Sequence, residues 1–194
     1  MKTDIILCGV GGQGILSIAS IIAQAAVKEG LYIKQAEVHG MSQRGGDVQS
    51  NLRISDKPIY SDLIPQGEAD VIISLEPMEA LRYLPYLSKT GFLVTNSTTF
   101  ENIANYPNKE DIFAQIDKMP RKVVLDVDAI AKEAGSVRTA NMVLLGASST
   151  FIDWLDYSLL EQGIQDTFGR KGEAIVAMNL KALAAGKAVS ESAR

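Results

Sequence analysis

The sequence predicts one α/β domain, a Rossmann-like doubly wound fold in which a mostly parallel sheet carries helices on both faces. Short apolar runs such as 4–8 and 71–75 have the length and composition of buried strands. Segments with apolar residues at helical spacing alternate with these runs. The 194 residues suffice for one hydrophobic core, and no repeat or low-complexity linker divides them. We therefore expect residues 1–194 to form a single domain.

The first half begins with a strand at 3–8, a glycine turn and a helix over 12–29, where Ile15, Ile18 and Ile22 share one face. Gly30 is placed to end this helix in a left-handed conformation. A second strand is predicted over 32–38, a polar loop over 39–46 and a half-buried strand over 48–54. A further short strand at 59–61 would complete an antiparallel hairpin at one edge of the sheet.

The second half continues the alternation. Strands are predicted over 69–75, 91–95 and 121–127. Helices are predicted over 78–87, from a cap at Asp128 to Ala134, over the uncharged stretch 141–154, from a capping box at Ser158 to residue 168, and over 173–185. The polar stretch 97–118 shows no clear period and stays unassigned.

Composition excludes several classes of function. The net charge is −4 and the lysines and arginines are scattered, so we expect neither nucleic acid nor a membrane as a partner. Nothing marks the chain for export, and one cysteine indicates a reducing, cytoplasmic location. An iron–sulfur cluster or a structural zinc site needs four Cys or His ligands, whereas the chain has one of each. It should therefore carry no such centre by itself.

Three loops are expected at the carboxyl edge of the sheet, where doubly wound folds bind ligands. They are residues 9–14, 37–46 and 76–77. The first contains a G-x-G-x-x-G pattern between a strand and a helix, formed by Gly9, Gly11 and Gly14 with Gly12 and Gln13 inside it. Its backbone amides could hold a phosphate, or its glycines could merely let the helix pack closely on the sheet.

The loop 37–46 is the most distinctive segment of the chain. Glu37 lies about 20 residues beyond the glycines, where a dinucleotide-binding domain keeps its ribose-binding acid. His39 could move a proton or could be a structural histidine. Arg44 could bind a phosphate or carboxylate, or form a surface ion pair. The candidate site in this loop further includes Ser42, Gln43, Gly45 and Gly46.

Two weaker candidates lie elsewhere. Glu76 ends a buried strand at the expected ligand edge, and Asn141 begins an apolar helix. Either side chain could simply cap a helix. The run 138–141 would also suit an anion at a helix N-terminus, although Thr139 as a cap would explain most of it.

Taken together, these residues carry a resemblance to a known family. The segments Gly9–Gly14, Glu37–Gly46, Glu76–Leu81 and Asn141–Gly146 resemble the gamma-type subunit of 2-oxoacid:ferredoxin oxidoreductases, with the greatest likeness to the beta subunit of indolepyruvate oxidoreductase. The string His39–Gly46 is far more specific than the glycine pattern. The resemblance covers nearly the whole chain.

The resemblance implies an oxidative decarboxylation in which a 2-oxoacid, coenzyme A and oxidised ferredoxin give an acyl-CoA, carbon dioxide and reduced ferredoxin. It also implies a larger partner subunit that carries thiamine diphosphate and the iron–sulfur clusters and passes electrons to ferredoxin. The present chain would bind none of these cofactors alone, and coenzyme A would be a co-substrate.

Within such an assembly we expect loops 9–14 and 39–46 to face the partner and help enclose the coenzyme A or substrate end of the active site, with Arg44 as the anion contact. No residue of this chain is expected to be catalytic. Two alternatives stay open: a stand-alone nucleotide-binding oxidoreductase that uses Glu37, and a purely structural subunit. Aryl pyruvates are favoured as substrates by resemblance only.

Overall fold

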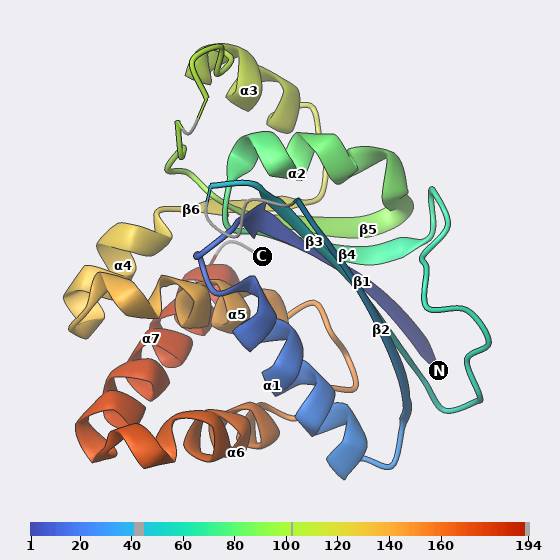
Figure 1. Cartoon of the computed structure of the whole chain (residues 1–194), viewed down its shortest axis with the longest axis vertical. Helices are drawn as coiled ribbons and strands as arrows, with labels where there is room; N and C mark the ends of the chain where they lie inside the picture. Colours follow the sequence, from blue (N-terminus) through green and yellow to red (C-terminus); the bar gives the residue numbers. More distant parts are fainter. Residues whose placement is uncertain (41–44, 102, 193–194) are drawn as a thin grey trace.

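The computed structural model describes residues 1–40, 45–101 and 103–192 (Figure 1). Its centre is a sheet with the strand order β2-β3-β1-β4-β5-β6. The strands are β1 Lys2–Val10, β2 Tyr32–His39, β3 Asp47–Ser55, β4 Ala69–Ser74, β5 Leu87–Asn96 and β6 Lys122–Leu125. β1, β4, β5 and β6 pair in parallel, whereas β3 is antiparallel to both β1 and β2. The predicted α/β class, the mostly parallel sheet and the antiparallel edge pair are confirmed.

The edge hairpin uses different strands from those expected. It consists of β2 and β3, which follow each other in the chain and pair antiparallel, and no strand forms at 59–61. The backbone of 56–68 is bound by side chains instead. Arg53 donates hydrogen bonds to the carbonyl oxygens of Ser61 (3.2 Å) and Leu63 (2.9 Å), and Asn51 accepts one from the N–H of Ile64 (3.3 Å). These contacts replace the ladder hydrogen bonds that a strand would need.

Helices cover both faces of the sheet, as predicted (Figure 1). One face carries α1 Ile15–Lys28, α4 Val127–Ala134, α5 Ala140–Ser149, α6 Tyr157–Phe168 and α7 Glu173–Ser192. The other carries α2 Pro77–Tyr83 and α3 Lys109–Ile116. Short 3-10 turns lie at Leu84–Tyr86, Val137–Thr139 and Gly169–Lys171. No helix in these described segments has both the length and the apolar character to cross a membrane.

Several expected helix boundaries are wrong. The cap of α4 is Asp126, whose Oδ1 accepts from the N–H of Ala129 (2.9 Å), rather than Asp128. α6 is capped by Asp156 rather than by Ser158. α5 ends at residue 149 and not at 154, and α7 continues to 192. The unassigned stretch 97–118 contains α3, whose cap is Asn108.

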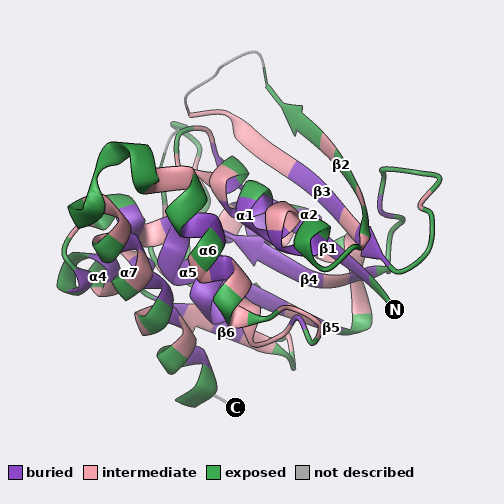
Figure 2. Cartoon of the chain, turned by 90° about the horizontal axis from the view of Figure 1, so that it is seen from below, coloured by how far each residue is buried: buried purple, intermediate pink, exposed green. Residues whose placement is uncertain are grey.

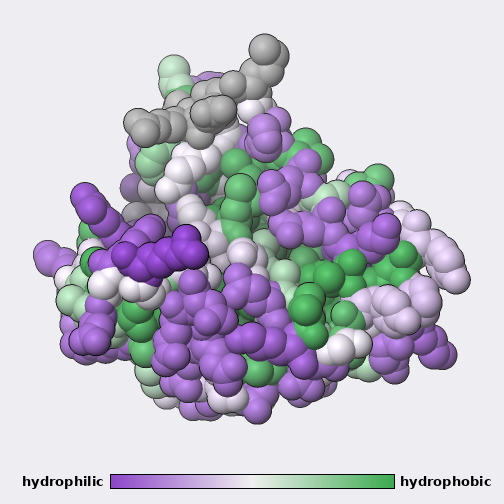
Figure 3. Space-filling view, turned by 60° about the horizontal axis from the view of Figure 1, so that its bottom comes forward, coloured by the Kyte–Doolittle hydropathy of each residue, from purple (hydrophilic) through white to green (hydrophobic). Residues whose placement is uncertain are grey.

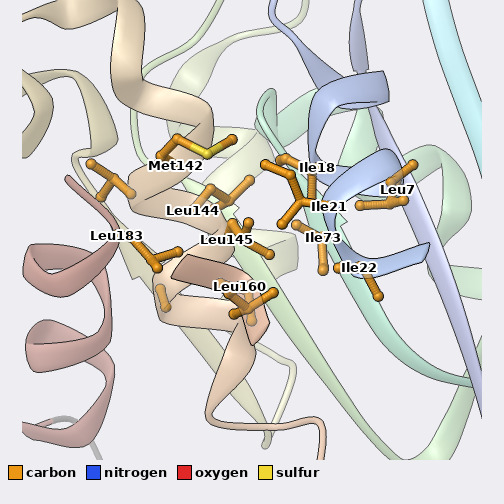
Figure 4. Close-up of a cluster of buried hydrophobic side chains, with 14 of the residues drawn as sticks. Leu7, Ile18, Ile21, Ile22, Ile73, Met142, Leu144, Leu145, Leu160 and Leu183 are labelled. Carbon is orange, nitrogen blue, oxygen red and sulfur yellow. The ribbon is translucent and has the colours of Figure 1, made fainter. Parts of the chain in front are cut away.

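The larger core lies between the sheet and α1, α5, α6 and α7. Ile18, Ile21 and Ile22 of α1 extend toward the side chains of α5 and the central strands (Figure 4). Burial is greatest along β1, β4 and α5 and least along the edge strand β2 (Figure 2). α5 is apolar all round because it packs against both the sheet and α7. On the outside, hydrophobic side chains occur as patches between hydrophilic ones (Figure 3).

Candidate functional site

The three loops expected at one edge of the sheet do meet there. The N–H of Gly11 donates to the carbonyl oxygen of Gly46 (2.8 Å), and the N–H of Gly45 donates to that of Gly11 (3.4 Å). The N–H of Leu75 donates to the carbonyl oxygen of Cys8 (3.1 Å). The ends of β1 and β4 and the start of β3 therefore form one continuous backbone surface at the carboxyl ends of β1 and β4.

Gln13 ties the glycine loop to the neighbouring strand. Its Oε1 accepts from the N–H of Val10 (2.7 Å), and its Nε2 donates to the carbonyl oxygen of Leu75 (3.3 Å). A Cβ on Gly9 would lie 2.7 Å from that Oε1, so a larger residue here would displace the Gln13 side chain from these hydrogen bonds. Gln13 is thus a cross-link within the edge rather than a free ligand-binding side chain.

The N-terminus of α1 lacks the usual caps. Gly14 precedes it with φ of 87°, no side chain caps it, and its first turn contains no acidic residue. Among the described residues, no acceptor binds the backbone N–H of Gly12, Gly14 or Ile15. Such an end concentrates unpaired donors and the positive end of the helix dipole, which suits an anion.

Asn141 holds the glycine loop from the side of α5. The residue is 8% exposed, and its Nδ2 donates to the carbonyl oxygen of Gly14 (3.3 Å). A Cβ on Gly14 would lie 2.6 Å from this Nδ2. Thr139, expected as the cap of α5, makes no such bond and donates instead to Ser136 (2.7 Å). Asn141 is therefore a packing partner of the loop and not a helix cap.

A cavity of about 380 Å³ opens beside the glycine loop. His39 is exposed at its rim, and its Nδ1 lies 3.4 Å from the carbonyl oxygen of Gly40. The lining is largely apolar and glycine-rich: Val10, Gly11, Gly12, Gly14, Ile15, Leu16, His39 and Val48. Met41, Ser42, Gln43 and Arg44 lie outside the described residues, so the anion contact expected at Arg44 stays a prediction.

A second, smaller cavity of about 240 Å³ lies at the ends of β4, β5 and β6. Asn96 lines it and was not expected as a site residue. Its Nδ2 donates to Asp128 (3.2 Å) and to the carbonyl oxygen of Leu75 (3.5 Å), and its Oδ1 accepts from the N–H of Val127 (3.3 Å). The only signal for Asn96 in the sequence is a polar residue directly after a buried strand.

Glu76 is fully buried, and both of its carboxylate oxygens are occupied. One accepts from the N–H of Glu79 (2.8 Å) and thereby caps α2. The other accepts from the N–H of Phe100 (3.3 Å) and from the hydroxyl of Tyr106. Burial and the hydrogen bond to Glu76 raise the pKa of Tyr106. Glu76 therefore anchors the loop after β5 and has no free oxygen for a ligand.

Glu37 lies apart from the glycine loop. β3 is inserted between β2 and β1, so Glu37 is two strands away from the turn that would hold a dinucleotide. Its carboxylate accepts from Nε2 of Gln35 (2.8 Å), and Glu37 is not part of the 380 Å³ cavity. In a dinucleotide-binding fold the acid must reach a ribose held at the first turn. This arrangement does not favour Glu37 in that role.

Cys8 does not fit the role of a cluster ligand. It is fully buried, its sulfur lies 3.8 Å from the carbonyl oxygen of Glu79, and burial raises the pKa of the thiol from 9.0 to about 12. Iron–sulfur clusters are held by exposed or cluster-facing thiolates, and a buried neutral thiol supplies none.

The site therefore consists of backbone donors and cross-linking amides. Comparison with known proteins identifies the family of the chain. Residues 4–189 match the family described as pyruvate ferredoxin/flavodoxin oxidoreductase. The chain belongs to this family. It is a gamma-type subunit of a 2-oxoacid:ferredoxin oxidoreductase and forms part of a multisubunit complex.

Two relatives illustrate the match in sequence. The indolepyruvate oxidoreductase subunit IorB of Archaeoglobus fulgidus is 39% identical over 194 residues, which covers 96% of this chain and 94% of that protein. The pyruvate/ketoisovalerate oxidoreductases common subunit gamma of Pyrococcus furiosus is 31% identical over 169 residues, 85% of this chain and 86% of that protein.

Solved structures show the same fold. The gamma subunit of a keto/oxoacid ferredoxin oxidoreductase from Geobacter sulfurreducens has a TM-score of 0.72 and 25% identity, and the match covers 98% of this chain and 99% of that one. The 2-oxoglutarate:ferredoxin oxidoreductase of Magnetococcus marinus, solved with 2-oxoglutarate, coenzyme A and succinyl-CoA bound, has a TM-score of 0.78 and 25% identity. The match covers 98% of this chain, which spans only 31% of that longer chain.

Proposed function

We propose that this gamma-type subunit carries no cluster and forms, together with a larger subunit, the coenzyme A and substrate end of an indolepyruvate-type oxidoreductase. The reaction converts a 2-oxoacid, coenzyme A and oxidised ferredoxin into an acyl-CoA, carbon dioxide and reduced ferredoxin. Loops 9–14 and 39–46 face the partner, and Arg44 contacts an anionic group of the ligand.

The observation that carries this proposal is the meeting of the two loops around the uncapped start of α1. The N–H of Gly11 donates to the carbonyl oxygen of Gly46, while no described residue accepts a hydrogen bond from the N–H of Gly12 or Gly14. Coenzyme A is a phosphate-bearing ligand, and unpaired amides at a helix N-terminus suit phosphate groups. The Magnetococcus marinus relative was solved with coenzyme A bound.

The electron-transfer chemistry belongs to the partner in this proposal. Cys8 is the only cysteine of the chain, and its burial and raised thiol pKa make it unfit to hold iron. Thiamine diphosphate and the iron–sulfur clusters therefore reside on the larger subunit, and ferredoxin accepts electrons from that subunit. This chain shapes the shared site and positions coenzyme A without a catalytic residue of its own.

The proposal of an aryl pyruvate as substrate rests on the names of the relatives. The Archaeoglobus fulgidus protein and the IorB subunit of Pyrococcus horikoshii, which is 42% identical over 152 residues, are both named for indolepyruvate. We therefore propose indolepyruvate as the substrate in preference to pyruvate or ketoisovalerate, for which the less similar relative with 31% identity is named.

The decisive experiment is reconstitution with the larger, thiamine-bearing subunit. Arg44→Ala should leave assembly intact and raise the KM for coenzyme A tenfold or more, because a charge-assisted contact to a phosphate contributes about 1.5–3 kcal/mol. Arg170→Ala is the matched control, since Arg170 is an exposed arginine outside the cavity. An Arg44→Ala variant with unchanged assembly and unchanged acyl-CoA formation would end the assignment.

The stand-alone alternative has its own test. Titration of the purified chain with NADH should show no tight binding and no hydride transfer, because Glu37 lies two strands away from the glycine turn. Saturable NADH binding that Glu37→Ala abolishes would favour the nucleotide-dependent oxidoreductase instead.

A further inference from the structure

A third cavity, of about 500 Å³, also borders the first turn of α1. Ser17 of α1 lines it, and none of its lining residues belongs to the 380 Å³ cavity described above. Its other walls come from the segment before α5, the end of α6 and the first turns of α7. It adjoins the 240 Å³ cavity, since Arg138 and Asn141 line both, and that smaller cavity is bordered by Gly12 and Gln13 of the glycine loop.

The charge of this cavity is positive. Arg138 and Lys171 both line it, and none of its described lining residues is an aspartate or glutamate. No described residue pairs with the Arg138 guanidinium, and the Lys171 ammonium contacts only the ring of Phe168, with 5.3 Å to its centroid. Two cations without carboxylate partners at one hollow favour an anionic ligand, above all a phosphate.

Asn141 contributes a buried acceptor that lacks a partner among the described residues, and it lines the same cavity. It lines the cavity and is 8% exposed. Because its Nδ2 donates to Gly14, the orientation of the amide is fixed, and the opposite atom, Oδ1, is an acceptor. This buried Oδ1 has no partner among the described residues. Buried acceptors are almost always satisfied. Because this Oδ1 is closed to solvent, a ligand hydroxyl reaches it only once the Asn141 side chain shifts toward the cavity.

The third feature of the cavity is an apolar part of its wall. Phe168, Ile175 and Met178 form part of its wall and offer a surface for a flat ring. A ligand that combines a phosphate, a hydroxyl donor and a flat apolar ring is a phosphorylated nucleoside. We infer that this cavity binds a nucleoside phosphate, with the phosphate at Arg138 and Lys171, a sugar hydroxyl at Asn141 and the base against Phe168.

This chemistry has two possible sources, a free nucleotide or the nucleotide end of coenzyme A. The probe is adenosine monophosphate, titrated into the isolated full chain by calorimetry, with adenosine and inorganic phosphate as fragments. Arg138→Ala should weaken binding tenfold or more and Lys171→Ala severalfold. Arg170→Ala, which removes a neighbouring exposed cation outside the cavity, should leave the affinity within twofold of wild type.

The site is refuted if wild type shows no saturable binding of adenosine monophosphate, or if the three variants bind it alike while unfolding at the wild-type temperature. Where binding is seen, repeating the titration with coenzyme A present distinguishes the sources. Competition identifies the nucleotide end of coenzyme A, and its absence identifies a free nucleotide; either result supports the site. Because this assay needs no partner subunit, its failure is distinguishable from a failure of the reconstitution with Arg44→Ala.

Discussion

Helices α5 and α7 cross at a glycine contact, and replacing Gly186 by alanine should destabilise the fold. A Cβ on Gly186 would lie 1.9 Å from the carbonyl oxygen of Val143, and real Cβ atoms are not found closer than 3.0 Å to such an atom. The helices would therefore have to separate by about 1 Å, which removes roughly a quarter to a half of the dispersion attraction between facing atoms. Val143 and Leu183, which lie at this crossing, are fully buried.

The size of the effect follows from two opposing contributions. Overpacking a tight contact costs about 1–3 kcal/mol, and here the obstructing atom is backbone, which places the cost at the upper end. Alanine is favoured over glycine inside a helix by about 1 kcal/mol, which offsets part of it. We expect Gly186→Ala to lower the free energy of unfolding by about 2 kcal/mol.

The assay is urea unfolding followed by circular dichroism, with Gly169→Ala as the matched control. Gly169 has helical φ and ψ of −54° and −38°, and no atom lies within 4 Å of the position that a Cβ would occupy there. This control should be neutral or stabilised by up to about 1 kcal/mol. A Gly186→Ala chain that unfolds at the wild-type urea concentration or above, with an unchanged slope, would refute the reasoning.

Three further predictions concern buried titratable groups. Because burial raises the pKa of the Cys8 thiol from 9.0 to about 12, iodoacetamide at neutral pH should modify Cys8 only after unfolding; rapid labelling of the native chain would contradict this. Burial also raises the pKa of Glu79, against the opposing effect of Arg82. A folded-state pKa above the unfolded value adds stability below about pH 4.5, and this stability is lost as pH rises through the folded pKa. In urea unfolding, the free energy of unfolding of Glu79→Gln relative to that of wild type should therefore be higher at about pH 7 than at about pH 4. Tyr106→Phe removes a donor from the buried carboxylate of Glu76 and should cost about 1.5–3 kcal/mol in the same assay, whereas a neutral result would show that the carboxylate is satisfied by other donors.

Local patterns predicted the parts of the fold that local interactions decide. The first strand, the glycine turn and α1 were all expected, because the apolar period and the glycines specify them within one segment. The pairing of β2 with β3 was not expected. A period of two identifies a strand but not its neighbour, and here the neighbour of β2 is the next strand in the chain, paired antiparallel.

In the site, too, the local features were predictable and the long-range contacts were not. The meeting of loops 9–14 and 39–46 followed from parallel strands ending at one edge, so it was predictable. The role of Asn141 was not, since its amide binds Gly14, 127 residues earlier in the chain. Asn96 and Tyr106 were missed for the same reason: their partners, Asp128 and Glu76, lie 32 and 30 residues away, and no spacing rule links them.

The long-range contacts of the site have one feature in common: amide side chains bind backbone carbonyl oxygens. Gln13, Asn96 and Asn141 each bind a backbone carbonyl of another segment at the edge of the sheet. These hydrogen bonds hold the backbone in one conformation: Gln13 and Asn141 hold the glycine loop, and Asn96 holds Leu75 beside it. The result is an edge whose available donors are backbone amides already in place before a ligand arrives, which lowers the entropy cost of binding. Such an edge supports the proposed role, in which this chain positions a phosphate-bearing co-substrate and the reacting groups belong to a partner.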